Sequence, residues 1–241
     1  MLANMQRLPG LLKRALCMAA CLAFACLASA RADDLDDFHR AVETAMSHHR
    51  AAAGYLRTGN IDLATLELEN LREAWAKAST LPRPAAFRDQ ERYTGTLLQI
   101  AAQLMGVSLV LNLGRVDVAR DSLDQIRKML SALRRENGVP VLADCVLDAN
   151  IAMEALFATG RTPDWDSALA GGDSYGATLQ RCDGLAPRVI HEHPEFRRLI
   201  DGALASLAQF PKAFETRDAD LLHRLMIALR SFDNLLAFRY G

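Results

Sequence analysis

The sequence lacks the short motifs that would assign it to a familiar enzyme class. It contains no Gly-x-Gly-x-x-Gly and no phosphate-binding loop, and its histidines show no motif context. No Cys-x-x-Cys occurs, which argues against thioredoxin-like exchange and excludes covalent c-type haem, since that attachment needs Cys-x-x-Cys-His. The sequence therefore supports no catalytic residue and no enzyme assignment.

Basic clusters are also absent, and lysine is rare. The whole chain has a formal net charge of −1, and without residues 1–32 it has 24 basic against 29 acidic side chains, a net charge of −5. A mildly acidic chain does not attract phosphate-rich surfaces. We therefore expect neither nucleic acid nor an anionic lipid surface as a partner.

The first 32 residues have the composition of a secretory signal peptide. Basic residues precede a short apolar run at 15–27, and small residues then lead to Ala30 and Ala32. The run is too short for a comfortable membrane span, and we expect no transmembrane helix in the mature chain. This pattern predicts cleavage near Ala30 or Ala32 and a periplasmic protein of a Gram-negative bacterium.

The cysteines suggest two different roles. Cys21 and Cys26 lie in the apolar run, where a lipid anchor on either of them is an alternative to simple cleavage. Cys145 and Cys182 remain in the mature chain, and an isolated pair in an oxidising compartment most often forms one disulfide. Such a disulfide would stabilise the fold by about 3–4 kcal/mol in the chain-entropy model.

Apolar residues recur at spacings of three and four along the mature chain, and no segment has the pattern of a strand. This pattern predicts an all-α protein, an antiparallel helical bundle in one domain spanning 33–241. A tetratricopeptide-like helical stack is the alternative. The bundle is expected to contain about four helical hairpins, at approximately 34–80, 89–137, 141–185 and 194–238.

One turn sequence occurs three times, with its turn position at Gly59, Gly114 and Arg217. An Asp follows each turn by three residues, and an Arg follows that Asp by ten. The copies are 55 and 103 residues apart, which differs from the 34-residue tetratricopeptide period and favours the bundle. The repeated arginines are interpreted as bridges between helices or, alternatively, as a converging set for an anionic ligand; they are Arg72, Arg127 and Arg230.

His49 is the first candidate for a metal site. It lies on the apolar stripe of its helix with Met46 one turn before it, and imidazole and thioether groups ligate haem iron or copper. His223 on the last helix would supply the opposite side if the first and last helices are neighbours. The alternative interpretation of His49 is a core histidine whose hydrogen bond is made to a neighbouring helix.

Two resemblances follow from these residues. The turn at 55–60 and the Arg-Ser-Phe-Asp at 230–233 resemble a family of small, uncharacterised exported helical proteins of Gram-negative bacteria, which implies no known activity. The helix lengths and the export signal are also similar to those of cytochrome c-prime and the soluble b-type cytochromes. That second resemblance implies a haem- or copper-binding electron-transfer bundle, without the haem-attachment motif.

An irregular stretch is expected from Gly160 to Asp173, where Trp165 and the nearby Tyr175 offer aromatic contact surface. We expect an exported helical protein that binds an unknown protein or small ligand there and requires no cofactor. The electron-transfer bundle is the alternative function. The helix at about 89–113 is apolar nearly all round and is expected to be the most buried element.

Overall fold

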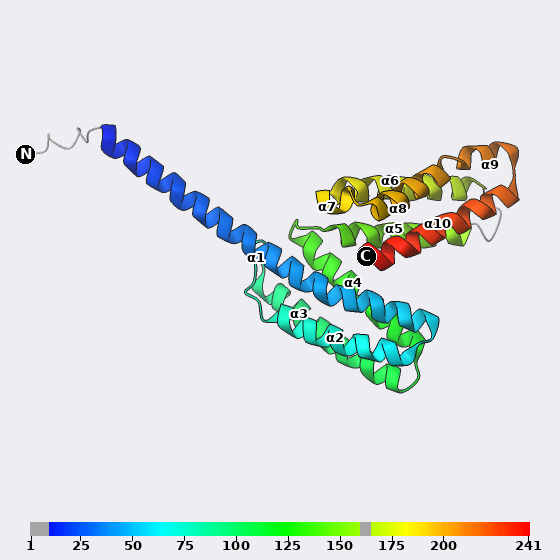
Figure 1. The fold of residues 1–241 in the computed structure, drawn as a ribbon, viewed down its shortest axis with the longest axis horizontal. Helices are drawn as coiled ribbons and strands as arrows, with labels where there is room; N and C mark the ends of the chain where they lie inside the picture. The colour runs from blue at the N-terminus through cyan, green and yellow to red at the C-terminus, as the bar shows by residue number, and fades with distance from the viewer. Residues whose placement is uncertain (1–9, 160–164) are drawn as a thin grey trace, which may run out of the picture.

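The computed structural model describes the backbone of residues 10–159 and 165–241, and the side chains of residues 34–158 and 165–241. Every regular element in these ranges is a helix (Figure 1), so the all-α prediction is confirmed. The helices are α1 (Gly10–Thr58), α2 (Ile61–Ser79), α3 (Gln90–Asn112), α4 (Val116–Glu136), α5 (Leu142–Thr159), α6 (Trp165–Leu185), α7 (Arg188–His191), α8 (Pro194–Leu207), α9 (Phe210–Thr216) and α10 (Ala219–Tyr240).

The first four helices form an N-terminal unit. Each packs against the next in sequence, and α1 also contacts α4. The apolar stripes meet in one buried cluster that runs from Phe38 to Leu133 and includes Trp75. The first part of α1 extends beyond the other helices in Figure 1. The unit is thus built from the two hairpins expected at 34–80 and 89–137.

The remaining helices form a C-terminal unit around a second cluster, from Leu142 to Leu236. Here α5 packs on α6 and α10, and α8 packs on α6 and α10. Proline occupies the first turn of α8, where the His193 side chain accepts a hydrogen bond from the Glu195 N–H, 3.3 Å. Pro211 lies in the first turn of a separate helix, α9. The predicted single domain therefore contains two apolar clusters rather than one.

The repeated turn has the same backbone conformation in all three copies. Gly59, Gly114 and Arg217 have φ values of 77°, 73° and 52°, in the left-handed region that ends a helix tightly. Arg217 is the one described non-glycine residue with positive φ. Asn60 and Asp218 then accept hydrogen bonds from N–H groups in the first turns of α2 and α10.

The expected irregular stretch is mostly helix. Residues 160–164 lie outside the described part, but α6 begins at Trp165 and continues through both glycines at 171 and 172. A Cβ atom added to Gly172 would lie 2.8 Å from the Phe210 ring, and one added to Gly171 would lie 3.0 Å from the Leu156 side chain. These glycines allow neighbouring helices to pack closely against α6. The expectation of an irregular stretch up to Asp173 is therefore wrong for the described residues from Trp165 onward.

The prediction that α3 is the most buried element is wrong. Leu98, Met105 and Leu109 lie on its exposed face, and Leu109 is 62 % exposed. Within residues 34–158 and 165–241, α3 is the one helix long and apolar enough to cross a membrane, and 33 % of its apolar stretch is buried inside the protein. The core helix of a soluble protein gives the same composition, so this finding does not by itself place α3 in a membrane.

Candidate functional site

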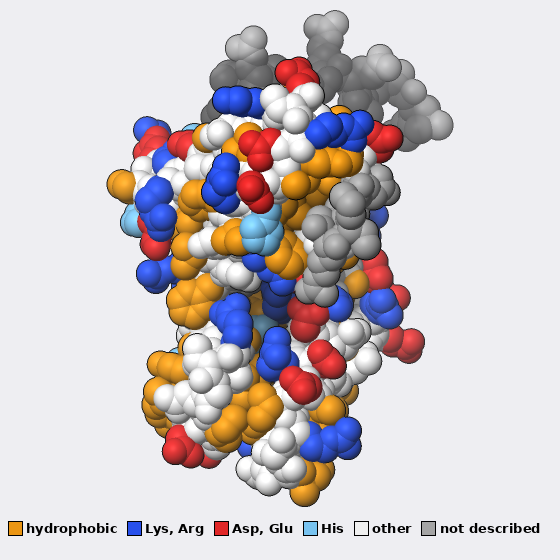
Figure 2. Space-filling view, turned by 90° about the vertical axis from the view of Figure 1, so that its right-hand side faces the viewer, with side chains coloured by type: hydrophobic (Ala, Val, Ile, Leu, Met, Phe, Trp, Pro, Cys, Tyr) orange, Lys and Arg blue, Asp and Glu red, His pale blue; other side chains and the backbone are white. Residues whose placement is uncertain are grey.

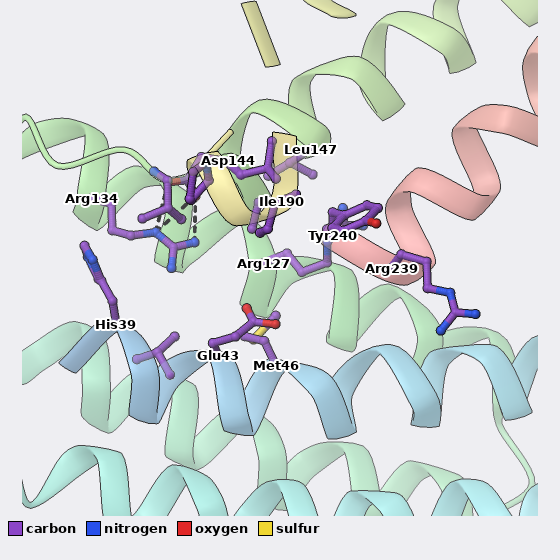
Figure 3. A pocket seen from close by; sticks show the side chains of 16 residues that line it. His39, Glu43, Met46, Arg127, Arg134, Asp144, Leu147, Ile190, Arg239 and Tyr240 are labelled. Atoms are coloured by element: carbon purple, nitrogen blue, oxygen red, sulfur yellow. Dashed lines mark hydrogen bonds and ion pairs between the residues drawn. The ribbon is translucent and has the colours of Figure 1, made fainter. Parts of the chain in front are cut away.

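A pocket of about 340 Å³ lies where the two units meet. Its walls come from α1 and α4 on one side and from α5, α7 and α10 on the other. Figure 3 shows His39, Glu43 and Met46 along one helix, with Arg134, Asp144, Leu147 and Ile190 across the space from them. We call this space the junction pocket. Much of its lining is apolar, from Val42, Met46, Val141, Leu142, Leu147, Ile190 and Tyr240.

A buried ion pair closes one end of the junction pocket and joins α4 to α5. Arg134 Nη2 donates to Asp144 Oδ1 at 2.6 Å, and Nε donates to Asp144 Oδ2 at 2.9 Å. The backbone N–H of Val141 donates to the same Oδ2, also at 2.9 Å. Since both side chains are buried and their charges are matched, this pair holds the walls together and offers no free charge to a ligand.

Two other polar groups of the junction pocket have an unpaired nitrogen. His39 Nε2 and Arg127 Nη2 are buried without a hydrogen-bond partner in the described part of the chain. Burial, together with the Arg134 charge, lowers the pKa of His39, so that its imidazole is neutral at pH 7. Buried polar atoms are normally paired. The junction pocket thus combines apolar walls with an imidazole and a guanidinium that a ligand can pair.

A second pocket of about 370 Å³ lies on the far side of Arg127, between α1, α4, α5 and α10. We call it the arginine pocket because four arginines line it, at 50, 57, 120 and 127. Figure 2 shows basic side chains gathered around the hollow between the two halves of the molecule. Arg127, which the internal repeat had singled out, lines both pockets.

The structure separates the three predicted metal ligands. His49 is 2 % exposed, and its Nε2 donates to the Leu123 carbonyl oxygen at 2.8 Å. Met46 on the same helix lines the junction pocket, whereas His49 lines the arginine pocket. His223 is exposed on α10, fourteen residues or about 21 Å of helix before Ala237, which is the first α10 residue in the lining of the arginine pocket.

This placement does not fit a haem or copper site shared by His49 and His223. The described residues contain no group of three or more His, Cys, Asp or Glu side chains able to hold a metal ion. Burial lowers the pKa of His49 to about 4, so its ring is neutral, and one of its two nitrogens is already used by a backbone carbonyl. His49 matches the alternative prediction of a core histidine, because its Nε2 forms a hydrogen bond with a neighbouring helix, α4.

The two predicted aromatic binding residues have different surroundings. Tyr175 is fully buried, and its hydroxyl donates to Asp233 Oδ1 at 3.4 Å, so its ring presents no surface to a partner. Trp165 is partly exposed at the start of α6, where its ring packs edge-on against Phe214 and lies under the Arg217 guanidinium. Trp165 therefore secures the α6 terminus against α9 and the repeated turn.

The predicted disulfide between Cys145 and Cys182 is present. The two Cα atoms are 5.3 Å apart, and the bond ties α5 to α6 inside the C-terminal unit. Sequence reasoning missed His39, Arg134 and Asp144, because no motif marks them and each becomes significant only where the two units meet. The one available signal was the repeated arginine, which pointed to Arg127.

Comparisons of the chain with protein-family models, with curated proteins and with solved structures found no match, so the candidate site is described from its own geometry.

Proposed function

We propose that this protein is exported to the periplasm and binds a small amphipathic ligand in the junction pocket. The observation that carries the proposal is the pocket itself, which is largely apolar and contains two unpaired buried nitrogens, on His39 and Arg127. Ligand sites are typically apolar clefts of roughly 300–1,000 Å³ with a few placed polar groups. The ligand's apolar body would lie against Met46 and Leu147, with its acidic end toward Arg127.

Export rests on the basic, apolar and small-residue order of residues 1–32. Expression of the full chain in a Gram-negative host followed by mass spectrometry of the periplasmic fraction tests it. We expect a mature protein that begins near Arg31 or Asp33. A full-length chain, or a lipid-modified chain that begins at Cys21 or Cys26, would contradict simple cleavage.

The junction pocket is tested with octanoate, an apolar chain with one carboxylate, by isothermal titration calorimetry. Leu147→Trp places a bulky ring in the pocket and should weaken octanoate binding at least about tenfold, because a fraction of the apolar contact is lost. Leu109→Trp on the exposed face of α3 is the matched control and should leave binding unchanged. Failure of octanoate to bind, or equal binding by both variants, would contradict the proposed site.

A further inference from the structure

The arginine pocket has the properties of a second, more polar ligand site. Its basic side chains come from two neighbouring helices, with Arg50 and Arg57 on α1 and Arg120 and Arg127 on α4. Guanidinium groups bind carboxylates through paired hydrogen bonds. Apolar atoms of Ala53, Leu123, Ala237 and Phe238 complete the lining, so the pocket offers a short aliphatic group a surface as well.

Several of these guanidinium groups have bonding capacity left for a ligand. Arg57 makes no hydrogen bond or ion pair with the described residues. Arg120 is 3.5 Å from Asp117, whose side chain is 93 % exposed, so water screens that pair strongly. Arg127 contacts Asp124 only at 3.4 Å through Nη1, and its Nη2 is unpaired. Arg50 differs, because it is engaged by Glu43 and the Gly241 carbonyl.

His49 adds a hydrogen-bond acceptor to the lining of the arginine pocket. Its Nε2 carries the proton, because it donates to the Leu123 carbonyl, so Nδ1 presents a lone pair. Nδ1 is buried and has no hydrogen-bond partner in the described residues, although the side chain belongs to the pocket lining. A neutral imidazole nitrogen of this kind accepts a hydrogen bond and cannot bind an anion. The pocket thus contains an acceptor beside its arginine donors.

Acidic side chains in the same lining restrict the charge of the ligand. Asp124 is paired with Lys128 at 2.8 Å, and Glu154 with Arg230 at 2.6 Å. Asp121 has no ion pair among the described residues. A free carboxylate beside the arginines repels a multiply charged anion such as a phosphate ester. One carboxylate with a hydrogen-bond donor nearby matches the lining better.

We propose that the arginine pocket binds a small carboxylic acid with a hydroxyl or ammonium group on the neighbouring carbon. The carboxylate is held by Arg57, Arg120 and the free nitrogen of Arg127. The adjacent donor pairs with His49 Nδ1, and a short aliphatic side chain contacts Leu123 and Phe238. This site differs from the junction pocket in its lining and in its ligand, and Arg127 is the one strong donor that the two share.

Three compounds with one carbon skeleton test this specificity by titration calorimetry. Leucine, 2-hydroxy-4-methylpentanoate and 4-methylpentanoate differ in carrying an ammonium, a hydroxyl or only hydrogen beside the carboxylate. We expect at least one of the first two to bind at least about tenfold more tightly than 4-methylpentanoate, because the deoxy compound leaves His49 Nδ1 unpaired. The stronger of the first two identifies the donor as ammonium or hydroxyl.

Substitutions locate the binding. Arg57→Ala and Arg120→Ala should each weaken the better ligand about five- to tenfold, while Arg72→Ala, an exposed arginine outside both pockets, should have no effect. Leu147→Trp should block octanoate but not this ligand, so failure of the junction pocket and failure of the arginine pocket are distinguishable. Equal binding of all three compounds, no binding of any, or an equal loss in Arg72→Ala would overturn the proposal.

Discussion

Two buried titratable residues, His49 and Asp233, respond to acid in opposite directions. Burial lowers the pKa of His49 from 6.5 to about 4, so its contribution to stability is complete above pH 6.5 and is lost as the pH falls toward 4. Burial raises the pKa of Asp233 from 3.8 to about 6, so the stability it contributes is complete below pH 3.8 and is lost as the pH rises through 6. Each effect amounts to about 3 kcal/mol, and the two largely cancel.

Replacing one of these two residues should reveal the pH dependence of stability that the other contributes. In Asp233→Asn, the hydrogen bonds from Asn150 and Tyr175 meet an uncharged group, and only the histidine still titrates. We expect the variant to lose about 2 kcal/mol more unfolding free energy than wild type between pH 7 and pH 4.5, measured by urea denaturation. His49→Gln, whose amide N–H replaces Nε2, should shift the pH dependence the opposite way. A pH response of Asp233→Asn equal to that of wild type would disprove the Asp233 assignment.

The Arg134–Asp144 pair allows a buried and an exposed ion pair to be compared between the same two helices. Arg135 and Asp148, 2.9 Å apart, also join α4 to α5, but both are partly exposed. Asp144→Ala leaves a buried guanidinium unpaired and should cost about 3–5 kcal/mol in denaturant unfolding. Asp148→Ala should cost less than about 1 kcal/mol. Equal losses of unfolding free energy in the two variants would contradict the larger cost expected for breaking the buried Arg134–Asp144 pair.

At the scale of the helix, two glycines with opposite surroundings test the close packing of α6. In Gly172→Ala, the new methyl group meets the ring of buried Phe210, and we expect a loss of about 1–3 kcal/mol. In Gly106→Ala on the exposed face of α3, nothing lies within 4 Å of the new methyl group, so the higher helix propensity of alanine should add about 0.5–1 kcal/mol. Thermal unfolding of both variants gives the signs, and a stabilised Gly172→Ala would contradict the packing described.

The sequence predicted the helices well and the burial of their faces less well. The spacing of apolar residues and the turn residues are local features of the sequence. The hairpins and the left-handed positions at Gly59, Gly114 and Arg217 can therefore be predicted from a few neighbouring residues. Whether a face is covered depends on a distant element. For that reason an apolar α3 was expected to be buried, and a glycine pair inside α6 was expected to form a loop.

At the scale of the molecule, the site depends on how two separate cores meet, and no sequence pattern encodes that contact. His39 on α1 and Asp144 on α5 are 105 positions apart, yet both line the junction pocket. The sequence identified His49 and Arg127 individually, from an apolar stripe and a repeat. It gave no indication that Arg127 would lie between two pockets.

The two units should also unfold separately, because each has its own buried apolar cluster and two pockets lie between them. Each unit contains one tryptophan, Trp75 in the N-terminal core and Trp165 on α6. Reduction of the Cys145–Cys182 disulfide removes a constraint worth about 3–4 kcal/mol from the C-terminal unit alone.

Fluorescence of the single-tryptophan variants Trp75→Phe and Trp165→Phe then reports each unit in turn. With reductant, the denaturant midpoint reported by Trp165 should fall, while the midpoint reported by Trp75 should stay unchanged. Since Trp75 is buried and donates to the Leu97 carbonyl oxygen, Trp75→Phe lowers the stability of its own unit, so the comparison is made with and without reductant within each variant. Midpoints that fall together in both variants would mean that the junction couples the two cores into one cooperative unit, and that a ligand in either pocket would stabilise the whole chain.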